Sequence, residues 1–326
     1  MARNVQIRIK AALLLFASVC ILTGCKKEMT LEHEYNFENR LDQFAEGIND
    51  SDGFSGAFAE EICVAYAVDE TETALTADAA GVFEIGGGDA VFERNVFARM
   101  NPASTTKIMT AIVALKYGDL DDLVTVTDAS IITESGSSMA GVKPGDVMSL
   151  EDLLYGLMIP SGNDAANAIA VHMGGSIEAF AEMMNAEAKR IGATGTHFVN
   201  ANGLTDPDHY TTAYDLYLMF NEALKYEKFR EIIGAYDHIA EYTDEKGEPK
   251  TATWGVGNYY MNGKAKTPEG LTVFGGKTGT TQAAGYCLIM GTRTENGREY
   301  ASVIMKADSR NALYEDMTEI ITKIDK

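Results

Sequence analysis

The sequence predicts an α+β fold, in which one antiparallel sheet is assembled from strands near both ends of the domain. Glu295-Asn296-Gly297 is a strong hairpin signal between the last two apolar runs. Between the early and late runs lies a long block with helical periodicity. This order predicts a sheet with helices packed on it and a mostly helical lobe inserted between early and late strands. The expected strands occupy 62–68, 81–85, 90–94, 271–277, 284–293 and 300–306.

Each expected helix has its own start or stop signal. The first, 104–117, carries apolar residues at helical spacing and ends at Gly118. A second opens at Ser149 and is ended by Pro160. The next two helices have possible caps, Asn163-Asp164 and Ser176. The later helices are expected at 165–173, 177–191, 211–226 and 311–324.

The first residues have the pattern of a secretory signal peptide. Three basic residues among the first ten precede an apolar run, 11–22, that is too short for a convincing membrane span. The run ends in Leu22-Thr23-Gly24-Cys25, which resembles a bacterial lipobox. We therefore expect residues 1–24 to be removed and Cys25 to be lipidated; the alternative is an ordinary signal peptide with a chance cysteine. Either way the domain is expected to work outside the cytoplasm, and two or three acyl chains would hold it at the cell membrane.

The rest of the chain divides into a tether and a folded domain. Residues 25–56 are polar and acidic and are expected to form the tether, whereas 57–326 can form one two-lobed domain. Loss of the signal peptide, which carries three positive and no negative charges, would lower the formal net charge from −21 to −24. Such a charge argues against binding to nucleic acid or to anionic lipid heads. It does not restrict the substrate, because a site can carry its own cations.

The four cysteines do not make a disulfide framework. Cys20 would leave with the signal peptide and Cys25 would carry lipid, so only Cys63 and Cys287 remain in the domain. They could pair in an oxidising compartment or stay as two buried thiols, and the second alternative is favoured. The five histidines lack zinc-binding spacing, and no Gly-x-Ser-x-Gly elbow is present. We therefore predict no metal, no cofactor and no histidine base.

Three short motifs follow one another along the chain: Ser104-Thr105-Thr106-Lys107, Ser161-Gly162-Asn163 and Lys277-Thr278-Gly279. Each motif alone is weak evidence for a function. Ser309-Arg310-Asn311 also has the Ser-x-Asn pattern of the second motif, but it follows Lys277 and is therefore out of order. Together they supply a nucleophile with an attached base, a hydroxyl and amide pair, and a cationic strand edge. This is the set that acyl transfer through a serine ester requires.

Ser104 and Lys107 are suited to act as a nucleophile and its base. Their separation of three residues at a helix start puts them on one face, one turn apart. The free N–H groups and positive field of a helix N-terminus favour an ionised serine. A lysine buried there near other cations would have a lowered pKa and could accept the serine proton. The alternative for this motif alone is a capped helix with a solvated lysine.

The sequence around the motifs resembles the D-alanyl-D-alanine carboxypeptidases, the serine-type penicillin-binding proteins of low molecular mass in peptidase family S11. The resemblance covers roughly 60–320 and is carried by 102–111, 158–166, 196–204 and 209–215. It implies a β-lactamase/transpeptidase-like fold with the active site between the sheet edge and the helical lobe. In that fold another strand would separate the two cysteine-bearing strands, too far for a disulfide. Many members carry a further β-rich domain, for which this chain is expected to be too short.

The resemblance also implies roles for the first two motifs. Ser104 would attack the peptide carbonyl and Lys107 would accept its proton. Ser161 would pass a proton between Lys107, Lys277 and the leaving amine. Asn163 would bind a substrate amide carbonyl and hold Lys107, besides capping a helix. The segments 196–204 and 209–215 are expected to be scaffold.

The third motif is implied to bind the C-terminal carboxylate of the substrate. Lys277 would supply positive potential and Thr278 a hydroxyl, while Gly279 would let the ligand backbone approach closely. The backbone N–H groups of Ser104 and Thr280 would form the oxyanion hole.

A downstream arginine pairs with the substrate carboxylate in this family. Arg310 falls near that position, and Arg293 and Arg298 are also available. Thr280-Thr281 departs from the family pattern, since many members have an aromatic residue or histidine after the glycine. The sequence therefore does not predict the shape of the subsite next to Thr280-Thr281.

The predicted activity is removal of the terminal D-alanine from peptidoglycan stem peptides through an acyl-enzyme, with β-lactams as covalent inhibitors. A D,D-endopeptidase would use identical chemistry. A non-catalytic β-lactam or cell-wall sensor is the alternative from another class, although no transmembrane helix beyond the signal is visible as a signalling route. A class A β-lactamase needs a downstream glutamate, and 193–214 contain none.

Overall fold

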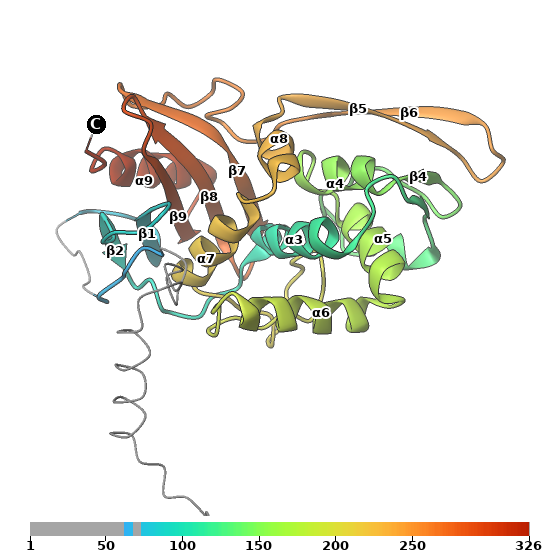
Figure 1. Cartoon of the computed structure of the whole chain (residues 1–326), viewed down its shortest axis with the longest axis horizontal. Helices are drawn as coiled ribbons and strands as arrows, with labels where there is room; N and C mark the ends of the chain where they lie inside the picture. The colour runs from blue at the N-terminus through green and yellow to red at the C-terminus, as the bar shows by residue number, and fades with distance from the viewer. Residues whose placement is uncertain (1–61, 68–72, 326) are drawn as a thin grey trace, which may run out of the picture. The chain divides into compact units, whose positions relative to one another are not determined.

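The computed structural model describes residues 62–67 and 73–325, so the predicted signal peptide, Cys25 and the tether lie outside the described residues. The larger sheet has five antiparallel strands in the order β2-β1-β9-β8-β7 (Figure 1). Because β7 is an edge strand, one side of its backbone is not used by the sheet. The strands are β1 Ala79–Glu84, β2 Phe92–Arg94, β7 Leu271–Thr281, β8 Gly285–Thr294 and β9 Glu299–Ala307.

Helices cover both faces of this sheet, because the strands present apolar side chains to both sides. In β9, Val303 and Met305 belong to the core that includes α7 (Ala213–Ala223), whereas Ile304 packs in the core that includes α9 (Arg310–Ile321). The two helices therefore lie against opposite faces (Figure 1).

The second lobe is organised around one enclosed helix, α3 (Lys107–Tyr117), which follows a 3-10 turn, η1 (Ala103–Thr106). Every residue from 107 to 114 is buried, so neighbours surround the first two turns of α3. This burial includes the side chain of Lys107. The other helices of the lobe and its border are α4 Leu150–Met158, α5 Asn163–Gly174, α6 Ile177–Arg190, α8 Glu227–Gly234 and the short 3-10 turn η2 Asp128–Ser130.

This lobe also contains a four-stranded antiparallel sheet, in the order β3-β4-β5-β6, which the sequence analysis did not predict. Two of its strands have only three residues, too few for alternation to be recognised. The other two form a hairpin whose turn is shaped by the Asp244 carboxylate, which accepts the N–H groups of residues 246 and 248. The fold class is confirmed, and the inserted lobe carries this small sheet beside its helices. Its strands are β3 Leu123–Thr125, β4 Val147–Ser149, β5 Asp237–Thr243 and β6 Pro249–Gly255.

The predicted strand at 62–68 is wrong over the described residues 62–67, where Val64 forms a single β-bridge. Side chains take up the other backbone groups of this segment. The N–H of Cys63 donates to the Tyr217 hydroxyl over 2.7 Å. The N–H groups of residues 66 and 67 both donate to the carboxylate of Glu93 over 2.9 Å. Side-chain partners therefore replace the sheet ladder that the apolar run suggested.

The remaining predicted elements are present with their ends shifted by a few residues. Ser176 caps α6 as predicted, by accepting the N–H of Ala179. The predicted cap of α5 by Asn163 is wrong: Gly162 is the N-cap residue, and Asn163 is the first residue of the helix. β7 is longer than the predicted 271–277, so the third motif lies inside this strand rather than near its end.

Cys63 and Cys287 are separate buried thiols, the alternative that the sequence favoured. Burial raises the pKa of both thiols to about 11, because removal from water disfavours the thiolate.

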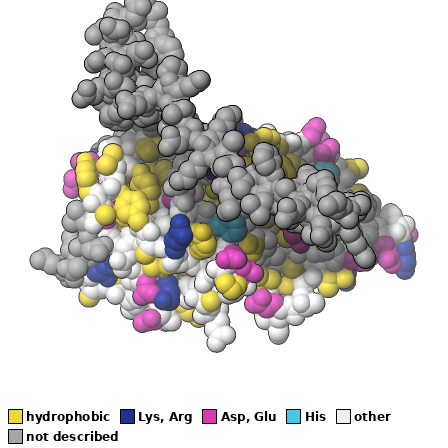
Figure 2. All heavy atoms as spheres, turned by 90° about the horizontal axis from the view of Figure 1, so that it is seen from below, with side chains coloured by type: hydrophobic (Ala, Val, Ile, Leu, Met, Phe, Trp, Pro, Cys, Tyr) yellow, Lys and Arg dark blue, Asp and Glu magenta, His cyan; other side chains and the backbone are white. Residues whose placement is uncertain are grey.

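The surface of the described residues mixes charges of both signs. On the face seen in Figure 2, Lys and Arg side chains lie among Asp, Glu and hydrophobic ones, so the negative net charge is not gathered in one patch there. Within 62–67 and 73–325, the helices are all too short or too polar to cross a bilayer.

Replacing Asp316 with alanine is expected to destabilise the lobe that contains the five-stranded sheet. The buried Asp316 carboxylate accepts the Thr76 N–H, the Thr76 hydroxyl at 2.8 Å and the Ala77 N–H at 2.9 Å, which ties the chain before β1 to α9. Loss of these charge-assisted bonds should lower the free energy of unfolding by about 2–4 kcal/mol in a urea titration. The exposed neighbour Glu315 is the control, and an equal effect of Glu315→Ala would contradict the assignment.

Candidate active site

The first motif folds into a strained turn before α3. Ala103 has φ of +49°, a left-handed conformation that residues with a Cβ rarely adopt. Gly203 presses against this turn with φ of +87°, and a Cβ added there would lie 1.9 Å from the Ala103 carbonyl oxygen. Only glycine permits this approach. The turn around Gly203 therefore fixes the backbone that carries Ser104.

Lys107 lies fully buried beside Ser104. Its Nζ is 3.0 Å from the Ser104 Oγ, 2.6 Å from the Asn163 Oδ1 and 2.6 Å from the Asn202 carbonyl oxygen. The last two atoms can only accept. In the neutral amine, both N–H groups are used by these oxygens, and the lone pair is left to accept the Ser104 hydroxyl proton.

The neutral form of Lys107 is also the one that its surroundings favour. Burial lowers the pKa of Lys107 well below its ordinary value, and the charge of Lys277 lowers this pKa further. The carboxylate of Asp164 acts in the opposite direction. The buried site therefore favours an unprotonated amine next to a hydroxyl, which is the arrangement of a serine nucleophile and its base.

Lys277 and Ser161 form a second buried pair across the site. The Lys277 Nζ donates to the Ser161 Oγ and to the Thr278 carbonyl oxygen, both over 2.8 Å. Burial lowers the pKa of Lys277 to about 7. Ser161, in the turn between α4 and α5, has φ of +63°, a second left-handed residue in a motif.

The segment 196–204, expected to be scaffold, contributes to the site directly. The carbonyl of Asn202 binds Lys107, and its side chain donates to the Asn167 Oδ1 over 2.9 Å. Asn200 shapes this turn by accepting the N–H groups of Asn202 and Gly203. The sequence signal was the Asn-x-Asn-Gly pattern, which is typical of a turn but does not reveal which carbonyl faces the site.

His209 is a buried positioning group. Its Nδ1 accepts the Val199 N–H at 3.1 Å, so its Nε2 carries the proton and donates to the Thr106 hydroxyl over 2.8 Å. Burial lowers the pKa of His209 to about 4, which keeps the ring neutral at physiological pH. The ring therefore binds the residue next to Lys107 rather than the hydroxyl of Ser104.

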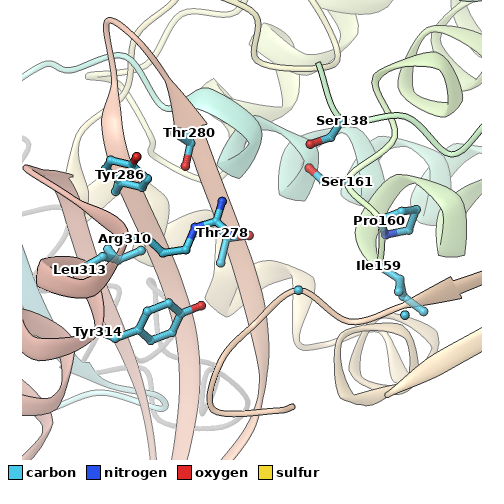
Figure 3. A pocket seen from close by; sticks show the side chains of 12 residues that line it. Ser138, Ile159, Pro160, Ser161, Thr278, Thr280, Tyr286, Arg310, Leu313 and Tyr314 are labelled. Carbon is cyan, nitrogen blue, oxygen red and sulfur yellow. The ribbon is translucent and has the colours of Figure 1, made fainter. Parts of the chain in front are cut away.

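An open cavity of about 250 Å³ lies between the edge of the larger sheet and the second lobe (Figure 3). Thr278 and Thr280 line it from β7, and Ser161 lines the opposite wall. Gly279, between these two threonines on β7, packs against the turn that carries Ser104, and a Cβ added there would lie 2.8 Å from the Ser104 nitrogen. The other lining residues are Ser138, Ile159, Pro160, Gly255, Gly257, Tyr286, Arg310, Leu313 and Tyr314.

Of the three candidate arginines, Arg310 is the one that lines this cavity. Its side chain extends from α9 toward Thr278 (Figure 3). Arg293 instead pairs with Glu299, and Arg298 donates to the carbonyl of residue 325. The structure thus brings every predicted site residue of the three motifs, Thr280 and Arg310 to one region. The exception among the predicted positions is Cys25, which lies outside the described residues.

The model of the peptidase S11 family, described as D-alanyl-D-alanine carboxypeptidase, matches residues 66–309 of this chain. The chain belongs to peptidase family S11. Its S11 relatives include the D-alanyl-D-alanine carboxypeptidase DacF of Bacillus subtilis, 37% identical over 238 residues, which are 72% of this chain and 58% of DacF. DacC of Escherichia coli is 33% identical over 269 residues, 79% of this chain and 64% of DacC. The chain therefore spans less than two thirds of either relative.

A solved structure of a DD-transpeptidase has the same fold. The crystal structure of the Streptomyces K15 DD-transpeptidase superposes with a TM-score of 0.71 at 29% identity, covering 77% of this chain and 97% of that one. The predicted family and the predicted fold class are both confirmed.

Lys277→Met should change how stability depends on pH. With a folded pKa of about 7 against an ordinary value of 10.5, Lys277 is neutral in the folded state and protonated in the unfolded state between these values. This group therefore destabilises the fold at pH 7, and its penalty is relieved as the pH rises toward 10.5. The stability advantage of Lys277→Met over wild type should shrink by on the order of 1 kcal/mol per pH unit from pH 7 to 10 in urea titrations. An advantage that does not change with pH would refute the lowered pKa.

Proposed function

We propose that this chain is a serine-type D-Ala-D-Ala carboxypeptidase that removes the terminal D-alanine from peptidoglycan stem peptides. The observation that carries the proposal is the fully buried Lys107 Nζ, 3.0 Å from the Ser104 Oγ and hydrogen-bonded to two acceptor-only oxygens. S11 membership and the names of the relatives, which are D-alanyl-D-alanine carboxypeptidases, support the choice of substrate.

Acylation begins when the Ser104 Oγ attacks the carbonyl carbon of the penultimate D-alanine and Lys107 takes the hydroxyl proton. The negative charge that develops on the carbonyl oxygen is stabilised by the backbone N–H groups of Ser104 and Thr280. The intermediate collapses to the serine ester as the C–N bond breaks. The proton that Lys107 accepted passes through the Ser161 hydroxyl, 2.8 Å from the Lys277 Nζ, to the leaving amine, which leaves Lys107 neutral again.

Substrate recognition uses the carboxylate of the terminal D-alanine. Arg310 and the hydroxyls of Thr278 and Thr280 line one part of the cavity and can bind a carboxylate there. Lys277, which precedes Thr278 on β7, adds positive potential to the site when its amine is protonated. Asn163, already bound to Lys107 through its Oδ1, offers its amide N–H groups to a substrate carbonyl.

Deacylation returns the enzyme to its starting state. Water attacks the ester carbonyl, its proton passes to Lys107, and the Ser104 oxygen leaves with a proton. A β-lactam would acylate the same serine, since its amide bond opens in the same way. Its leaving nitrogen stays tethered to the acyl group, so the ester is released slowly.

Release of D-alanine from a purified stem pentapeptide is the test of this proposal. Wild type should release it, whereas Ser104→Ala and Lys107→Ala should lower the rate by at least about 10³-fold. Lys116→Ala is the matched control, because Lys116 lies near the end of the same helix, is only partly buried and pairs with the carboxylate of Glu187. Cleavage of a cross-linked peptide dimer without release from the pentapeptide would favour the endopeptidase. Acylation by penicillin without turnover of either peptide would favour the sensor.

We further propose that the chain is a lipoprotein on the outer side of the cell membrane, anchored through Cys25. The basic start, the apolar run 11–22 and the lipobox-like Leu22-Thr23-Gly24-Cys25 support this proposal. Residues 25–56 would then be the tether and 57–326 the catalytic domain.

Cys25→Ser should move the protein from the membrane fraction to the soluble extracytoplasmic fraction, because serine lacks the thiol that would carry the acyl group. Cys63→Ser is the control, since the buried Cys63 belongs to the domain. Retention of Cys25→Ser on washed membranes at the wild-type level would reject the lipid anchor.

A further inference from the structure

One wall of the cavity is built from a residue outside the three motifs. Ser138 is exposed and lines the cavity on the side opposite β7. Figure 3 shows the hydroxyls of Ser138 and Ser161 on the same wall, both directed toward the strand that carries Thr278 and Thr280. The loop 138–142 that carries Ser138 contains no helix or strand, so it needs other anchors to hold a fixed position.

A buried carboxylate supplies the main anchor of this loop. Asp164, which is fully buried, accepts the N–H of Ala140 at 2.8 Å, of Gly141 at 2.7 Å and of Val142 at 3.0 Å. A carboxylate taken out of water is costly unless several donors surround it. Here the donors are consecutive backbone N–H groups, so Asp164 and the loop hold each other in one geometry.

Two further elements bind the same loop. The Asn163 N–H donates to the Ser138 carbonyl oxygen over 2.9 Å. The Trp254 Nε1 on β6 donates to the Ala140 carbonyl oxygen over 2.8 Å. The loop also packs tightly against the turn before α5, because a Cβ added to Gly162 would lie 2.7 Å from the Ala140 Cβ. The loop is thus fixed from the start of α5 and from the second sheet, and Ser138 is held at a set distance from β7.

An extended peptide in this cavity would lie between two polar walls. The free edge of β7 can bind one side of a peptide backbone, as in strand addition. The other side of the same backbone would face the 138–142 loop, where a hydroxyl can donate to a carbonyl or accept from an N–H.

We propose that Ser138 hydrogen-bonds the peptide backbone of the acyl part of the substrate, opposite β7, and that Asp164 is the positioning residue that sets Ser138 in place. The ligand class is an extended peptide whose chain continues on the amino side of the penultimate D-alanine. This inference rests on the proposed carboxypeptidase function and deepens it.

Asp164 could instead act through Lys107, since its charge opposes the lowering of the Lys107 pKa. The two routes give different results. Loss of the Asp164 charge through Lys107 alone would shift the acidic limb of the pH profile of kcat/KM to lower pH. Loss of Ser138 placement would lower kcat/KM at all pH values and leave the limb where it is.

The test compares kcat/KM for a stem pentapeptide in wild type, Ser138→Ala, Asp164→Asn and the double variant of the full chain. The amide of Asn cannot accept all three loop N–H groups. Each single variant should lose about 10-fold, as expected for one hydrogen bond to a substrate. The double variant should lose no more than the larger single loss, because both changes remove the same contact. Acetyl-D-Ala-D-Ala, which lacks most of the acyl chain, should be cleaved by Ser138→Ala at the wild-type rate.

Asp146→Asn is the matched control, because Asp146 is a buried carboxylate that binds the N–H of Lys143 and not the 138–142 loop. Ser138 is exposed, so Ser138→Ala should fold normally even if Asp164→Asn does not. A wild-type kcat/KM for Ser138→Ala, fully additive losses, or a shifted acidic limb as the only effect of Asp164→Asn would each overturn the inference. Failure of wild type to release D-alanine would reject the proposed function instead.

Discussion

The burial of two lysine side chains is the constraint on which the rest of this site depends. Lys107 and Lys277 are almost completely removed from water, yet the partners of their amines are amide and carbonyl oxygens and hydroxyls rather than carboxylates. An ammonium in such a place is unfavourable, so the fold stabilises the neutral amine. Lys116, on the same helix as Lys107, shows the contrasting solution, since its partly buried amine pairs with the carboxylate of Glu187.

Each lobe contributes one of these lysines, so the reactive centre exists only where the lobes meet. Lys107 is buried because α3 is enclosed over its first two turns, and Lys277 is buried because β7 packs against the turn that carries Ser104. Gly203 and Gly279 allow the backbones to come close enough for this contact. The strain at Ala103 and Ser161 is then the local cost of a geometry that the surrounding packing imposes.

The roles of the motif side chains could be predicted from the sequence because they depend on residue type and on spacing along the chain. The sequence could not predict the carbonyl of Asn202 as a ligand of Lys107, since a backbone acceptor has no residue signature. Asp164 looked like a helix cap, and its three loop N–H partners depend on a chain segment more than twenty residues away. The apolar run at 62–67 predicted a strand, but side chains of Tyr217 and Glu93, distant in sequence, accept its N–H groups instead. The second sheet was missed because long-range pairing, not local alternation, defines its three-residue strands.

The pKa of Lys107 tests the central claim most directly. NMR titration of the protein with ¹³C-labelled lysine, compared with Lys107→Met to assign the signal, would measure it without substrate. The account predicts a Lys107 signal that titrates well below the ordinary pKa of 10.5 and below that of Lys116, which is paired with a carboxylate. A Lys107 signal that titrates together with the surface lysines, near 10.5, would mean that the amine is protonated at neutral pH and cannot serve as the base for Ser104.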